Sequence, residues 1–91
     1  MKKYIKKPIP IEAVQWTGGN RAEILNFCRI AHFEYPENEF DFAVLFIHTL
    51  EGNMRVNVGD YVIKGVYNEF YGCAKDIFET TYEEVKDDKV S

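Results

Sequence analysis

The chain has 91 residues, of which 46% are hydrophobic and 15% aromatic, and this apolar content excludes a globally disordered protein. This length fits one domain with a modest core, so we expect a single domain over residues 1–91. The formal net charge of −4 argues against a nucleic-acid duplex as the main partner, because duplex binding requires a basic surface.

The chain opens with a basic segment, residues 1–7, which we expect to form an extended lead-in. Pro8 and Pro10 follow, and a residue before a proline is biased towards extended backbone. The apolar residues of 9–16 then predict a first strand. No segment has the pattern of a signal peptide or is apolar over the length of a membrane span. We therefore expect a cytoplasmic protein that does not contact the membrane.

A helix is predicted after the first strand. Thr17-Gly18-Gly19-Asn20 forms a turn signal, and Asn20 with Glu23 resembles a capping box at a helix start. Apolar residues repeat at helical spacing and predict a helix over 21–31. The next segment, 32–41, is rich in charged and aromatic residues around Pro36, which predicts an irregular loop.

The second half of the chain predicts a meander of short antiparallel strands joined by tight turns. The strands are expected at 43–49, 54–58, 61–66 and 70–73. Asp76 is expected to cap a short helical segment, residues 82–85 either continue it or add an edge strand, and 86–91 form a frayed tail.

This order of elements predicts an α+β fold. We expect one small antiparallel sheet of four to five strands, one main helix and a short C-terminal helical segment. Because one helix cannot cover both faces of such a sheet, the other face is expected to hold the aromatic loop or to meet a second subunit. We favour a homo-oligomer.

No catalytic constellation is recognisable in the sequence. There is no serine before Ser91, the two histidines lack metal-ligand spacing, and neither cysteine has a C-x-x-C partner. A pair of carboxylates brought together by folding, or a Cys–His dyad through Cys73, remains open at this point. We predict a protein that is not an enzyme and that has no metal site and no cofactor.

A binding site for a small anionic ligand is the sharper prediction. Backbone N–H groups at a helix start bind anions, although Gly18-Gly19 lacks the spacing of a phosphate loop and a plain turn is the alternative. Aromatic rings would stack a base, and cations would hold phosphate. The predicted ligand-binding residues are Lys7, Trp16, Gly18, Gly19, Asn20, Arg55, Tyr61, Lys64 and Tyr71.

Several segments resemble a family of small phage and prophage proteins of Gram-positive bacteria. They are Pro-Ile-Pro-Ile-Glu-Ala-Val-Gln-Trp at 8–16, Leu-Glu-Gly at 50–52, the Val58-Gly59-Asp60-Tyr61 turn with the strand that follows it, Glu-Phe-Tyr at 69–71, and 76–83. The family's hallmark is a Pro-Gly-Asp-Tyr turn, and Val58 replaces the proline here. Gly72 stands where a second proline is expected. Most members of this family have no assigned activity.

The resemblance implies a phage-encoded accessory protein that acts in the host cytoplasm. By analogy with compact phage oligomers that sequester nucleotide signals, we expect a counter-defence protein that binds a cyclic or other signalling nucleotide without turnover. Two alternatives remain open. One is a protein inhibitor of a host defence nuclease, acting through acidic surface mimicry. The other is a structural accessory protein of the phage.

Overall fold

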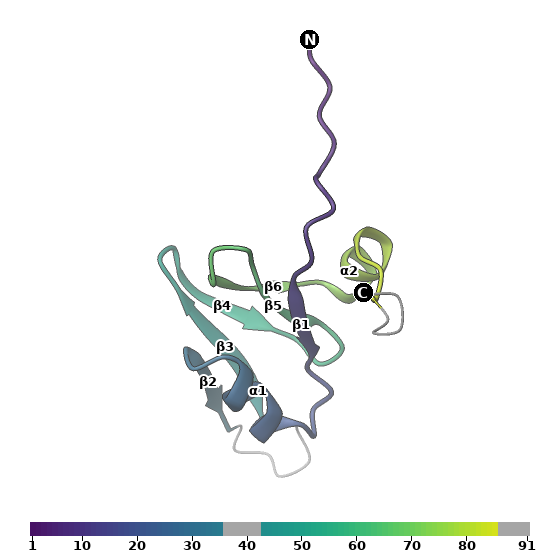
Figure 1. Cartoon of the computed structure of the whole chain (residues 1–91). Coiled ribbons are helices and arrows are strands. Elements are labelled where there is room, and N and C mark those ends of the chain that lie inside the picture. Colours follow the sequence, from purple (N-terminus) through teal and green to yellow (C-terminus); the bar gives the residue numbers. More distant parts are fainter. Residues whose placement is uncertain (36–42, 86–91) are drawn as a thin grey trace.

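The structure is a computed structural model and describes residues 1–35 and 43–85. This part of the chain has an α+β fold with two antiparallel three-stranded sheets and two short helices (Figure 1). In chain order the elements are β1 (Glu12–Gln15), α1 (Arg21–Phe27), β2 (Ala31–Glu34), β3 (Val44–Thr49), β4 (Gly52–Val56), β5 (Tyr61–Lys64), β6 (Phe70–Cys73) and α2 (Lys75–Thr81).

The α+β class and the antiparallel pairing agree with the sequence prediction, whereas a single sheet of four to five strands does not. One sheet has the order β1-β5-β6 and the other β2-β3-β4, so the predicted meander breaks between β4 and β5. The break follows from the turn between them, in which Gly59 has φ +99°. The backbone of Trp16 exchanges hydrogen bonds with Gly59 and Asp60, and this exchange pairs β5 with β1 instead of β4.

The second sheet contains the strand that the sequence did not predict. Ala31–Glu34 forms β2 and pairs with β3, in the segment where we expected the end of the helix and an irregular loop. Helix α1 ends at Phe27, because Cys28 adopts an extended conformation (φ −127°, ψ 102°). The rest of the predicted loop, 36–41, lies outside the described residues, as does the predicted tail, 86–91.

The other element boundaries shift by a few residues. The first strand begins at Glu12 instead of residue 9, because Pro10 has no backbone N–H to donate to the sheet. Residues 1–11 form no regular structure and leave the body as an extended arm, which we call the N-terminal arm (Figure 1). Helix α2 ends at Thr81, and 82–85 do not form a strand.

The core lies where the two sheets and α1 meet. Its fully buried side chains are Trp16, Ile24, Cys28, Leu45, Ile47, Val56 and Val62. The first sheet approaches the second closely at Gly72 of β6, where an added Cβ would lie 2.9 Å from Cγ2 of Val56. Neither helix of the described chain is long and apolar enough to cross a membrane.

Candidate functional site

The structure separates the nine residues that we predicted for an anion site. Trp16 is in the core, Gly18, Gly19 and Asn20 lie in the turn before α1, and Arg55 lies on the second sheet. Lys64 lies at the end of β5, opposite Glu12 and Phe70 in the strand register. The remaining three, Lys7, Tyr61 and Tyr71, lie in or beside one cleft, which is the candidate site.

Trp16 does not have a free face on which a base could stack. Its side chain is 1% exposed, and its ring centroid lies 5.1 Å from that of Phe33. Its backbone N–H donates to Asp60 O at 2.8 Å, and its carbonyl accepts from Gly59 N at 2.6 Å. The predicted stacking role of Trp16 is therefore wrong. Sequence reasoning could not distinguish the two roles, because a tryptophan at the end of a strand suits a core and a pocket equally well.

The turn before α1 is a closed hydrogen-bonded unit, which favours the plain-turn alternative. Asn20 Oδ1 accepts from both the backbone N–H and the hydroxyl of Thr17, at 2.9 and 3.0 Å. Asn20 Nδ2 donates to Gln15 O and to Glu23 Oε1, both at 2.7 Å. Asn20 occupies the N-cap position, but its side chain makes no capping bond to a helix N–H, so the predicted capping box does not form.

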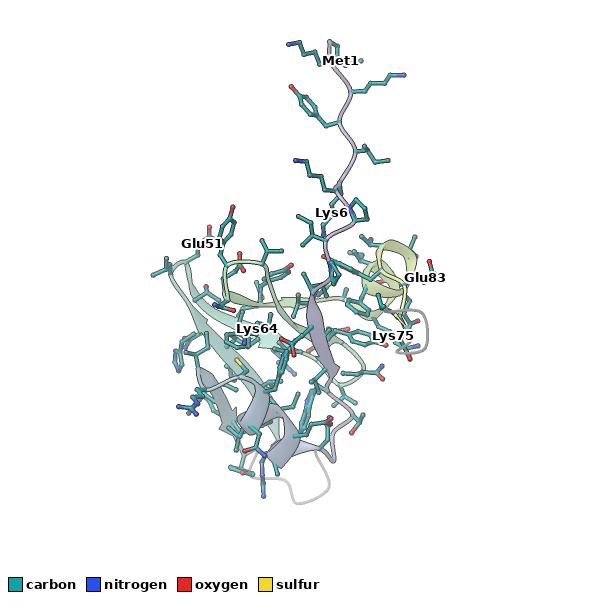
Figure 2. The ribbon with its side chains drawn as sticks, in the orientation of Figure 1. Met1, Lys6, Glu51, Lys64, Lys75 and Glu83 are labelled. Carbon is teal, nitrogen blue, oxygen red and sulfur yellow. The ribbon has the colours of Figure 1, made fainter. Side chains whose placement is uncertain are left out.

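A cleft of about 870 Å³ separates the base of the N-terminal arm from α2. One wall is the arm with the start of β1, and the other is Tyr61 with α2 and the residues after it. Figure 2 shows Lys6 at the base of the arm and Glu83 beyond the end of α2. The lining residues are Lys6, Lys7, Pro8, Ile9, Pro10, Ile11, Ala13, Tyr61, Phe78, Glu79, Thr81, Tyr82, Glu83, Glu84 and Val85.

Three stacked rings and one lysine run through this cleft, and we call them the ring ladder. Tyr61 stacks on Phe78 with ring centroids 3.9 Å apart, and Phe78 stacks on Tyr82 at 4.9 Å. Lys6 Nζ lies 4.3 Å from the centre of the Tyr82 ring and donates to its hydroxyl at 2.5 Å. Phe78 lies in α2, and Tyr82 is the residue that follows the helix. Because they are four residues apart, their side chains lie on the same side of α2.

The Val58-Gly59-Asp60-Tyr61 turn holds both walls of the cleft in place. Asp60 Oδ1 accepts from the backbone N–H of Lys75 at 3.0 Å, so its carboxylate satisfies a donor in the first turn of α2. Ala74 occupies the N-cap position, whereas the carboxylate of Asp76, the predicted cap, accepts from the backbone N–H of its neighbour Ile77. The turn depends on the positive φ of Gly59 and on the carboxylate of Asp60, and neither requires a particular side chain at Val58.

Tyr71 and Tyr82 are hydrogen-bonded to each other, and this bond shifts their pKa values in opposite directions. Burial and, second to it, a hydrogen bond with Tyr82 together raise the pKa of Tyr71 to about 12. Hydrogen bonds from Lys6 and from Tyr71 lower the pKa of Tyr82, because both stabilise the phenolate. Tyr71 therefore acts as the donor and Tyr82 as the acceptor, with the Lys6 ammonium beside it. Tyr61 donates to Glu79 Oε2 at 3.1 Å.

Lys6→Ala is expected to raise the pKa of Tyr82, because the ammonium is the largest cause of its lowered value. The pKa of Tyr71 stays high, since burial is the main cause there. The measurement is a titration followed by phenolate absorbance, with Tyr82→Phe identifying the contribution of Tyr82. Lys7→Ala is the matched control and should titrate like the parent. Superimposable curves for Lys6→Ala and the parent would contradict the ring ladder.

The two walls of the cleft carry opposite charges. Lys6 and Lys7 come from the arm, and Glu79, Glu83 and Glu84 come from α2 and the residues after it. Glu79 is partly neutralised, because its Oε1 lies 3.7 Å from Lys75 Nζ. A ligand that lies across the cleft therefore meets cations on one side and hydrogen-bond acceptors on the other, with aromatic rings between them.

Sequence reasoning missed three members of the site: Lys6, Phe78 and Tyr82. Lys6 belongs to the basic segment for which we predicted only an extended lead-in, and the four-residue spacing of Phe78 and Tyr82 is the signal that could have identified those two rings. The surroundings of Cys73 argue against the Cys–His dyad. Burial raises the pKa of Cys73, which is the opposite of what a nucleophile needs. The residues that the structure describes contain no group of three or more metal-ligating side chains suited to an ion.

Comparisons of the chain with protein-family models, with curated proteins and with solved structures find no significant match. The candidate site therefore has to be interpreted from its own geometry.

Proposed function

We propose that this protein acts by binding and not by turnover, and that its ligand is a small anionic molecule of the nucleotide class held in the cleft. In this proposal it is a phage-encoded counter-defence protein that sequesters a signalling nucleotide, such as a cyclic nucleotide, in the host cytoplasm. The observation that carries the proposal is the ring ladder, in which a run of stacked rings ends under a lysine ammonium.

An exchange of contacts at Tyr82 would admit the ligand. A cation over an exposed ring contributes about 0.5–1 kcal/mol, whereas a base stacked on an aromatic ring contributes about 1–3 kcal/mol. On the ring face alone, a base that displaced Lys6 would therefore gain free energy. The ammonium would also give up its hydrogen bond to the Tyr82 hydroxyl, and it would replace this bond by pairing with the phosphate of the same ligand, together with Lys7.

The opposite wall favours a base that carries hydrogen-bond donors. The carboxylates of Glu83 and Glu84 accept hydrogen bonds and repel phosphate, so they orient the phosphate towards the arm. Exocyclic amino groups of adenine, guanine or cytosine match this wall, whereas uracil and thymine lack such a group. We therefore propose that the cleft prefers amino-bearing bases.

The second candidate function is inhibition of a host nuclease through acidic surface mimicry. It is supported by the charge of the chain outside the N-terminal arm. All 15 acidic residues but only 7 of the 11 lysines and arginines lie from Glu12 onward, which gives this part a formal charge of −8. Inhibition by acidic mimicry assigns no role to the ring ladder, and for that reason we rank it second.

Calorimetric titration with a panel of linear and cyclic nucleotides tests the first proposal. We expect heat of binding with at least one adenine, guanine or cytosine nucleotide, weaker heat with its uracil counterpart, and recovery of intact ligand after denaturation. Accumulation of product over time would instead identify an enzyme. No heat with any nucleotide would overturn the proposal, and capture of a purified nuclease would then favour the second candidate.

A further inference from the structure

The outer part of the N-terminal arm exposes apolar side chains that its own body does not cover. Tyr4 is 89% and Ile5 93% exposed, and Lys2 and Lys3 precede them. The arm points away from both sheets (Figure 1). Burial of exposed apolar side chains is favourable, so a partner surface that covered this segment would be stabilised by it.

The tips of two β-hairpins form a surface of matching chemistry, which we call the hairpin-tip surface. It comprises Leu50 and Glu51 between β3 and β4, with Val66, Tyr67 and Glu69 between β5 and β6. Leu50 is 109% and Tyr67 86% exposed, and Val66 is also exposed. Figure 2 shows Glu51 at its hairpin tip, on the side of the molecule from which the arm leaves.

We infer that residues 1–5 of one copy dock on the hairpin-tip surface of a second copy, so that two chains form a two-fold dimer by exchanging arms. Charge complementarity supports this partner. Residues 1–5 carry two lysines and no acidic residue, while the hairpin-tip surface carries two glutamates and no lysine or arginine. Lys2 and Lys3 would meet Glu51 and Glu69, and Tyr4 and Ile5 would cover Leu50, Val66 and Tyr67.

The geometry suits exchange between copies better than docking within one chain. Arm and tips lie on the same side of the body in Figure 1, so two copies facing each other through this side present each arm to the other's tips. Residues 6–11 line the cleft of their own chain, which leaves only residues 1–5 free to reach outward. The inference does not depend on the ligand proposed for the cleft.

Sedimentation analysis of the full chain over a range of concentrations tests the dimer. We expect a dimer that weakens with added salt. Tyr4→Ser with Ile5→Ser should weaken dimerisation by at least about tenfold, and so should Leu50→Ser with Tyr67→Ser, since each pair removes buried apolar area. Ile77→Ser is the matched control, because Ile77 is an exposed apolar residue of α2, outside the hairpin-tip surface.

A charge exchange gives the decisive result. Lys3→Glu and Glu51→Lys should each weaken the dimer, and the chain carrying both should recover it. The arm has no regular structure, so its variants should melt like the parent. A monomer at every concentration would overturn the inference. A dimer whose affinity is unchanged by the arm variants would overturn it too. So would a dimer that is weakened by the arm variants but not by the hairpin-tip variants.

Discussion

Trp16→Ala is expected to lower the free energy of unfolding by about 3–5 kcal/mol, the usual cost of deleting a large aromatic side chain from a core. Trp16 is 1% exposed and packs on Phe33, so its removal leaves a cavity that the two sheets cannot close. Domains of this size have about 5–15 kcal/mol of stability, so the loss is a large share of the whole. Urea unfolding followed by circular dichroism measures it.

Trp16→Phe is the control for this prediction, because it keeps a packed ring and should lose clearly less stability than the alanine variant. A loss below about 1 kcal/mol for Trp16→Ala would show that the ring is not in the core. That result would return Trp16 to the candidate ligand-binding residues, because a tryptophan with little structural role has a free face.

Gly72→Ala is expected to destabilise the fold by about 1–3 kcal/mol, the typical cost of overpacking. Its Cβ would lie 2.9 Å from Cγ2 of Val56 and 3.2 Å from Sδ of Met54. Val56 is buried and β-branched, so its χ1 rotation is restricted and relieves the clash poorly. The two sheets would have to move apart, and the measurement is again the midpoint and slope of urea unfolding.

Gly19→Ala is the matched control, since no atom lies within 4 Å of the Cβ it would add. Its free energy of unfolding should stay within about 0.5 kcal/mol of the parent value. Equal effects of the two substitutions would mean that β6 does not approach β4 as closely as described. The close approach of Val56 also accounts for a glycine at position 72, where the family resemblance predicts a proline.

The sequence predicts correctly those elements that can be recognised from their own residues, without knowledge of their partners in the fold. The apolar segment at 43–49 became β3, and 70–73 became β6 with the same bounds. The strand β2 was missed because its polar residues, His32 and Glu34, suggested a loop, whereas its pairing with β3 is what makes it a strand. Strand pairing depends on partners distant in the chain, which local composition does not encode.

The candidate site was predicted only in part for the same reason. Lys7, Tyr61 and Tyr71 come from three distant segments, and nothing in their spacing says that they lie near one cleft. Strand pairing brings them together, because β5 with Tyr61 pairs with β1, which follows the arm, and with β6, which holds Tyr71. The Asp60 carboxylate then fixes α2 beside these strands, and this bond could not be predicted, because a backbone N–H of α2 leaves no mark in the sequence.

Calorimetry on two double variants tests the central claim, that the cleft binds an anionic nucleotide. Lys6→Ala with Lys7→Ala removes two cations from the cleft, and Arg55→Ala with Lys64→Ala removes two cations that do not line it. For any nucleotide that binds the parent, we expect the first variant to lose at least about tenfold in affinity, since each charge-assisted contact contributes about 1.5–3 kcal/mol. The second variant should bind like the parent. Equal loss in both variants, or loss in the second alone, would contradict the account.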